Sequence, residues 1–97
     1  MEKLALLAIL EAKPGKENEV AELLKSAIPL AQAEPGTIRW YGLQLGPSTF
    51  GIFDTFQQES DRQAHLSGPI AAALSAKAAD LLAAPPRIEM VSLLAVK

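Results

Sequence analysis

The stretch TIRWYGLQLGPSTFGIFDTF, residues 37–56, holds two runs of β-branched and aromatic residues on either side of a short break. Thr37–Leu45 and Thr49–Phe56 are each long enough for a strand, and Gly46-Pro47-Ser48 between them is typical of a turn. The sequence therefore predicts a β-hairpin at the centre of the chain. The segments on each side of this hairpin decide the rest of the fold.

The segment before the hairpin predicts one strand and one long amphipathic helix. Leu4–Leu10 is apolar at every position, which indicates a strand buried on both faces. After a turn at Pro14-Gly15, apolar residues recur with helical spacing. We expect a helix over residues 16–33 that is kinked at Pro29 and that ends at Glu34-Pro35-Gly36.

Two further helices and a last strand are expected after the hairpin. Ser60 and Gln63 have the spacing of a capping box, so a short helix is expected to begin at Ser60. Gly68-Pro69 ends this helix and starts the next one, with the proline at the first helical position. That helix is expected to end at Pro85-Pro86, before a strand over Arg87–Val96.

The order of elements is β-α-β-β-α-β, and residues 1–97 are expected to form one domain. With right-handed crossovers, this order gives a ferredoxin-like α+β fold, in which a four-stranded antiparallel sheet carries its helices on one face. Period-two alternation then places five apolar side chains on the uncovered face: Leu7, Ile9, Tyr41, Leu43 and Leu45. Because an exposed apolar sheet face is prone to aggregate, we expect a homodimer that packs through this face.

Composition excludes several classes of function. The net charge of −2, with no basic cluster, argues against a nucleic-acid partner. The chain has no cysteine and one histidine, which excludes disulfides, thiolate chemistry and a histidine-rich metal site. No glycine-rich cradle follows a strand, and we expect no cofactor. The apolar run at the start is too short for a bilayer and a poor signal peptide, so a soluble, cytoplasmic protein is expected, with no membrane partner.

The single histidine, His65, is the leading candidate for chemistry. It lies at the end of a predicted helix, where it could serve as a general base at a pocket or could simply bind backbone carbonyls at the helix end. Asp54 lies on the same strand face as Phe50, Ile52 and Phe56. A carboxylate among aromatic residues needs a partner if it is buried, so Asp54 could pair with His65 as a catalytic dyad, form a purely structural ion pair or cap a helix.

Two other side chains are singled out. Trp40 is close to Gly42 on one strand face, which would leave room over the indole for a flat ligand, although core packing is the alternative. We expect Trp40 to line the same cavity as His65 and Asp54. Arg62 could reach an anionic substrate, but we expect its side chain to face solvent.

Four segments together resemble the antibiotic biosynthesis monooxygenase family of dimeric α/β barrels. They are KPGKENE after the first strand, IPLAQAEPGTIRWY at the kinked helix and second strand, FGIFDTF in the third strand and RQAHLSGPIAAAL, which continues into the last helix. The resemblance spans most of residues 4–94. It implies a pocket between the sheet and the helices, whose walls we expect to include Trp40, Phe56, Ile52, Ala8 and Leu74, with His65 and Asp54 as catalytic residues.

The resemblance implies more than one activity. Members of the family oxidise phenolic or quinol-like aromatics with dioxygen and no cofactor, and others degrade haem or isomerise small phosphorylated sugars. The haem-degrading branch carries an Asn and a Trp at the positions of Ala8 and Phe56, so haem degradation is not expected here. Asp54 stands where the family often has Glu. The leading hypothesis is a cofactor-independent monooxygenase for a small aromatic or quinol-type molecule; the alternatives are a non-catalytic dimer that binds a small apolar ligand and a proton-transfer isomerase.

Overall fold

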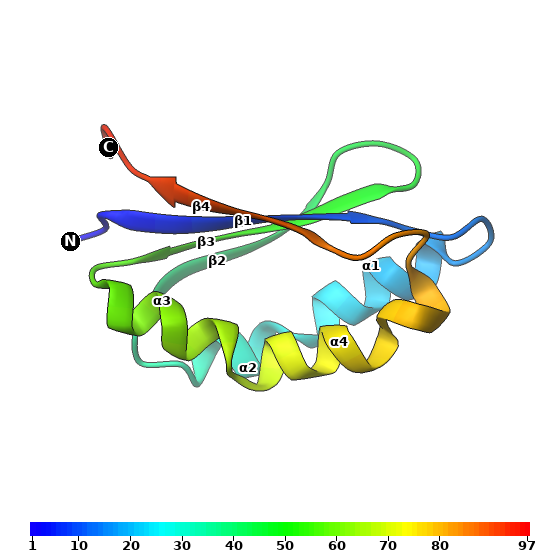
Figure 1. Cartoon of the computed structure of the whole chain (residues 1–97), viewed down its shortest axis with the longest axis horizontal. Coiled ribbons are helices and arrows are strands. Elements are labelled where there is room, and N and C mark those ends of the chain that lie inside the picture. Colours follow the sequence, from blue (N-terminus) through cyan, green and yellow to red (C-terminus); the bar gives the residue numbers. More distant parts are fainter.

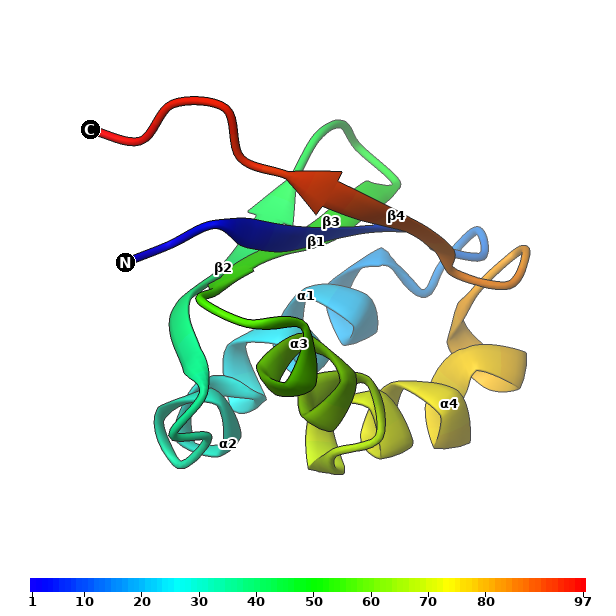
Figure 2. The ribbon, with the colours of Figure 1, turned by 60° about the vertical axis from the view of Figure 1, so that its left-hand side comes forward.

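A four-stranded antiparallel sheet carries all of the helices on one face (Figures 1 and 2). The computed structural model describes residues 1–97. Its strands are β1 (Leu4–Glu11), β2 (Thr37–Gln44), β3 (Thr49–Phe56) and β4 (Arg87–Ser92), in the spatial order β2-β3-β1-β4. Its helices are α1 (Glu17–Ser26), α2 (Ile28–Gln32), α3 (Glu59–Leu66) and α4 (Pro69–Leu81). The predicted ferredoxin-like fold is therefore confirmed.

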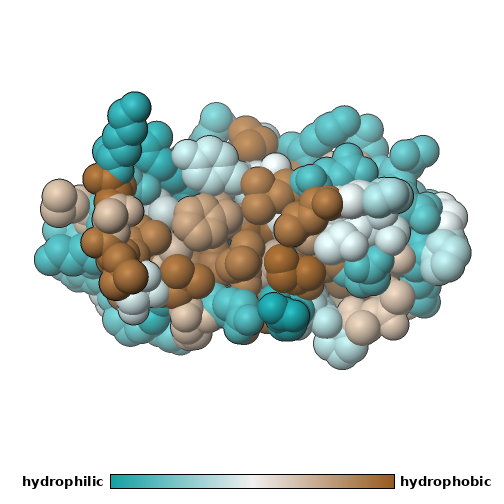
Figure 3. Space-filling model, turned by 90° about the horizontal axis from the view of Figure 1, so that it is seen from above, coloured by the Kyte–Doolittle hydropathy of each residue, from teal (hydrophilic) through white to brown (hydrophobic).

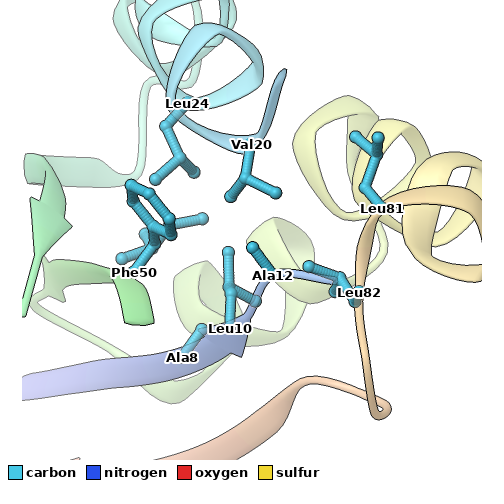
Figure 4. Close-up of a cluster of buried hydrophobic side chains, with 9 residues drawn as sticks. Ala8, Leu10, Ala12, Val20, Leu24, Phe50, Leu81 and Leu82 are labelled. Atoms are coloured by element: carbon cyan, nitrogen blue, oxygen red, sulfur yellow. The ribbon is translucent and has the colours of Figure 1, made fainter. Parts of the chain in front are cut away.

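The core lies between the helix-facing side of the sheet and helices α1 and α4. Leu10 of β1 and Phe50 of β3 are buried opposite Val20 and Leu24 of α1, and Leu81 covers them from the end of α4 (Figure 4). These strand residues alternate with residues of the open face, as the period of two requires. The core cluster consists of Ala8, Leu10, Ala12, Val20, Leu24, Phe50, Ile52, Leu81 and Leu82.

The expectation of one kinked helix around Pro29 was wrong, because the chain forms two separate helices there. Ala27 ends α1, with its amide bonded to the Leu24 carbonyl at 3.2 Å, and it also precedes the first residue of α2. Pro29 stands at an early position of α2, where a missing N–H leaves no helical hydrogen bond unmade. Ala31 of α2 is still buried, so the apolar pattern of α1 continues into α2 although the helix is interrupted between them.

The predicted capping box was also wrong. Helix α3 begins at Glu59, one residue before Ser60, and its N-cap is Gln58 in an extended conformation. The Ser60 hydroxyl bonds the side chain of Gln58 at 3.3 Å, and no side chain caps the helix. Gln63, the other half of the predicted box, instead donates to the Glu59 carboxylate at 3.0 Å.

The last strand and last helix are shorter than predicted. Strand β4 ends at Ser92, because its partner β1 begins at Leu4, directly opposite. Helix α4 begins at Pro69 as predicted but ends at Leu81, since Leu82 forms a bridge with Ala12 at the end of β1.

The open face of the sheet is rich in apolar side chains, as predicted. The register pairs Leu7 of β1 with Phe53 of β3 and pairs Phe53 with Tyr41 of β2, so all three lie on one face. The rings of Tyr41 and Phe53 stack with centroids 6.4 Å apart. The space-filling view of this face shows a broad hydrophobic area (Figure 3), and Tyr41 and Leu45 are 45% and 56% exposed.

Candidate active site

His65 is buried in the last turn of α3, with a carboxylate at each ring nitrogen. Its Nδ1 lies 2.6 Å from Oε1 of Glu34, and its Nε2 lies 2.8 Å from Oδ2 of Asp54. The ring of Phe56 packs beside the imidazole, with centroids 5.5 Å apart. The imidazole side chain is only 7% exposed. His65 is therefore held by side chains from a loop and from β3, and not by backbone carbonyls at the helix end.

Asp54 is the most deeply buried carboxylate of the site. It points from β3 toward the helices, between Ile52 and Phe56, and its side chain is 0% exposed. Its Oδ1 has no hydrogen-bond partner, and the short contact of Oδ2 with His65 is an ion pair that lacks the alignment of a good hydrogen bond. A fully buried carboxylate thus keeps acceptor capacity that no group of the chain uses.

The two carboxylates favour the protonated form of His65. Burial lowers the pKa of the imidazole, but the close contact with Asp54, the hydrogen bond with Glu34 and the negative charges of both outweigh burial and raise it to about 9. Both ring nitrogens then carry protons, and a group in that state cannot accept one. The single positive charge of the ring then lies between the two carboxylates.

A small, mainly apolar cavity adjoins this ion-paired group between the sheet and helices α3 and α4. Its volume is about 50 Å³. The walls are Leu6, Ala8, Ile52, Asp54, His65, Leu66, Ile70, Ala71, Leu74 and Ile88. Of the predicted pocket residues, Ala8, Ile52 and Leu74 lie in this wall with Asp54 and His65. Phe56 does not line the cavity and instead supports the imidazole.

Trp40 does not line this cavity, which corrects the expectation of a shared pocket. It lies opposite Asp54 on β2, but it lines a second hollow of about 230 Å³ with Gly42, next to α1. A Cβ at Gly42 would lie 3.6 Å from two atoms of the indole, so this glycine does leave space at the ring edge. The indole also packs against the cluster of Ala27, Ala31 and Ile70, while Ile70 itself lines the Asp54 cavity. That packing keeps the two hollows apart.

Glu34 is the site residue that sequence reasoning missed. It belongs to the Glu34-Pro35-Gly36 segment, which has the composition of a helix stop. Its side chain is 15% exposed and accepts a hydrogen bond of 2.7 Å from the Thr37 hydroxyl. No spacing signal could relate it to His65, because 31 residues separate the two in the chain.

Arg62 is buried, and the expectation that it faces solvent was wrong. Its Nη1 donates to the carbonyls of Ala5 in β1 and Val91 in β4, each at 3.1 Å. Its other nitrogens bind the Glu59 carboxylate, which lowers the pKa of Glu59 to about 2 through hydrogen bonds from Arg62 and Gln63. Arg62 therefore ties α3 to two strands and is not available to a ligand.

No three side chains of the His, Asp or Glu type converge as ligands for a metal ion. None of the helices has both the length and the apolar character needed to cross a bilayer.

This chain is a small ferredoxin-like protein that holds an imidazole and two carboxylates between its sheet and its helices. The family model described as antibiotic biosynthesis monooxygenase matches residues 4–77, and the chain belongs to this family. No curated protein matches the sequence.

Solved structures share the fold of this chain. A protein of unknown function from Nitrosomonas europaea is 62% identical, with a TM-score of 0.98 over 100% of this chain and 94% of that chain. A protein from Pseudomonas aeruginosa is 20% identical, with a TM-score of 0.83 over 98% of this chain and 97% of that one. A protein from Mycobacterium tuberculosis is 18% identical, with a TM-score of 0.84 over 97% of each chain. The last two share the fold.

Proposed function

We propose that this chain is a cytoplasmic homodimeric monooxygenase-like protein that acts without a cofactor on a small aromatic or quinol-type molecule. One observation carries the proposal: Asp54 is fully buried, has unused acceptor capacity and lies in the wall of an otherwise apolar cavity. Such a carboxylate is suited to bind and deprotonate a hydroxyl or an activated methylene group of an apolar molecule. In this proposal the proton-acceptor role passes from His65, the base expected from the sequence, to Asp54.

The chemistry needs the substrate as its source of electrons. Asp54 removes a proton from a methylene group that a neighbouring phenol activates, and the cationic His65 stabilises the negative charge that develops. The carbanion then reacts with dioxygen. One oxygen atom becomes a carbonyl oxygen at that carbon and the other leaves as water, so the four electrons come from the substrate. The apolar wall excludes bulk water from the anion.

Entry of a substrate requires the cavity to widen. A cavity of about 150 Å³ is needed to hold benzene, whereas this one has about 50 Å³. Helix α4 is the element suited to move, because only Ile70 and Leu81 of its thirteen residues are buried. Ile88, at the edge strand β4, lines the same cavity and is 44% exposed, so it marks the rim.

The homodimer of the proposal rests on the open face of the sheet. Tyr41 and Leu45 are largely exposed there, and the hydrophobic area continues across neighbouring strands (Figure 3). At roughly 25 cal/mol per Å², burying several hundred Å² per subunit contributes on the order of ten kcal/mol before association costs. A second copy of the chain offers the same apolar surface and would cover it.

Oxygen uptake with a panel of phenols, quinols and anthrone-type ketones tests the proposal. We expect turnover by the wild-type protein and a loss of about 10²–10⁴-fold in Asp54→Asn, the usual range for a lost general base. Glu22→Gln, which removes an exposed carboxylate of α1, is the matched control and should keep full activity. Conversion of a panel member without oxygen uptake would indicate an isomerase, and saturable binding without conversion would indicate a binding protein; either result refutes the monooxygenase.

A further inference from the structure

The second carboxylate of the site, Glu34, reaches His65 from outside the cavity. It projects from the loop between α2 and β2, and its Oε1 accepts from Nδ1 of His65 at 2.6 Å and from the Thr37 hydroxyl at 2.7 Å. The ring thus separates two environments. Nε2 faces Asp54 and the apolar cavity, whereas Nδ1 faces a polar surface hollow of about 160 Å³ that Glu34 and Asp61 help to line.

The loop that carries Glu34 is built to lie close to α3. A Cβ at Gly36 would lie 2.6 Å from Oδ1 of Asp61, closer than atoms can approach, so only glycine lets the loop pass this helix. At Gly68, before the start of α4, a Cβ would lie 3.3 Å from Oε2 of Glu34, which is a tight contact. The two glycines therefore leave room for the loop and for the Glu34 carboxylate beside α3 and α4.

The geometry favours protons on both ring nitrogens. Ionised carboxylates can only accept hydrogen bonds, and a neutral imidazole has a single N–H to donate. With both carboxylates ionised, only an imidazolium directs an N–H toward each of them, at 2.6 Å for Glu34 and 2.8 Å for Asp54. The titratable groups that face the ring are Asp54 from β3, Glu34 from the loop and Asp61 from its own helix, and all three are acidic.

We propose that Glu34 is a positioning residue: it holds Nδ1–H of His65, so that the ring remains a fixed cation and Asp54 remains the proton acceptor of the cavity. That Glu34 contributes to a reaction rests on the proposed function of the cavity. That Glu34 accepts the hydrogen bond from Nδ1–H of His65 rests on the geometry alone. Without Glu34, the ring would lose its proton more readily. One tautomer of the neutral ring has no proton on Nε2, the nitrogen that faces Asp54, and the ion pair between His65 and Asp54 would then be lost.

Nuclear magnetic resonance titration of the single histidine tests this directly, because His65 gives the only imidazole signals of the chain. For the wild type we expect two protonated ring nitrogens at pH 7 and a pKa of about 9. In Glu34→Gln we expect the pKa to fall by about one to three units, the effect of losing an adjacent opposite charge. Glu22→Gln makes the same change of charge far from the ring and should leave the titration unchanged.

Glu34→Asp keeps the charge and withdraws it by one methylene group. We expect its His65 pKa to lie between the values of the wild type and Glu34→Gln. A folded Glu34→Gln with the wild-type titration would overturn the proposal. If that variant does not fold, an unchanged titration in Glu34→Asp would overturn it as well.

The reaction and the positioning role fail in different ways. Absence of turnover in the wild type refutes the proposed function, while the titration still decides whether Glu34 holds the proton. Where turnover is found, the alkaline limb of the pH profile of kcat/KM should move in Glu34→Gln by the same number of pH units as the His65 pKa. A shifted titration with an unmoved profile would show that Glu34 has no part in the reaction.

Discussion

Raising the pH from 6 to 9.5 should lower the stability of this protein, and the deprotonation of His65 should account for a large part of the loss. The folded state raises the pKa of the imidazole from 6.5 to about 9. The resulting stabilisation is fully present below pH 6.5, where both states bind the proton, and it is lost as the pH rises through 9. One pKa unit corresponds to 1.36 kcal/mol, so a difference of about 2.5 units gives a loss of roughly 3 kcal/mol. Because a small domain has about 5–15 kcal/mol in total, this loss is large.

Urea unfolding measured at half-unit steps of pH provides the assay. We expect the free energy of unfolding to fall mainly between pH 7 and pH 9.5, with an unchanged dependence on urea concentration. His65→Gln lacks the titrating imidazole. Its pH dependence of stability therefore reports the contribution of lysine, tyrosine and the terminal amine, which can be subtracted. Equal slopes for the wild type and His65→Gln across this range would refute the assignment of His65 as a buried cation.

Two further predictions concern stability and assembly. Arg62→Met keeps the apolar stem but removes the donors to two strand carbonyls, so we expect a loss of about 2–3 kcal/mol in urea unfolding. Arg39→Met, at an exposed arginine paired with Glu2, should cost much less, and equal losses for the two variants would contradict the buried role of Arg62. Leu43→Asp places a charge on the open sheet face and should convert a sedimenting dimer into monomers at micromolar concentration, whereas an intact dimer would show that this face is not the interface.

The strands could be predicted because their signals are local. Thr49–Phe56 is bounded as predicted, and the alternation of Phe50, Ile52 and Asp54 along it correctly placed the aspartate on the buried face. The meeting of Asp54 with His65 followed from the short link between β3 and α3. In each case, a period of two or a connection of a few residues carried the information.

One error arose from a local signal, and the others arose where contacts over long distances decide the structure. The apolar stripe through Ala31 suggested one helix, although a proline is also typical of the first turn of a new helix, which is where Pro29 lies. The side chain of Trp40 could turn toward either end of the helix-facing side of the sheet, and packing against α2 decided its direction. Glu34 reached the site through a loop whose path depends on Gly36 lying against Asp61, which no periodicity records.

The contact of Arg62 with both Ala5 and Val91 has a consequence for local opening. Strand β4 has β1 as its single partner, and an edge strand of this kind would ordinarily be the first to separate from its sheet. Here its Val91 carbonyl is also bound to α3, the helix that carries His65. Separation of the C-terminal strand therefore breaks a contact of the helix beside the cavity, so we expect β4 and α3 to open together.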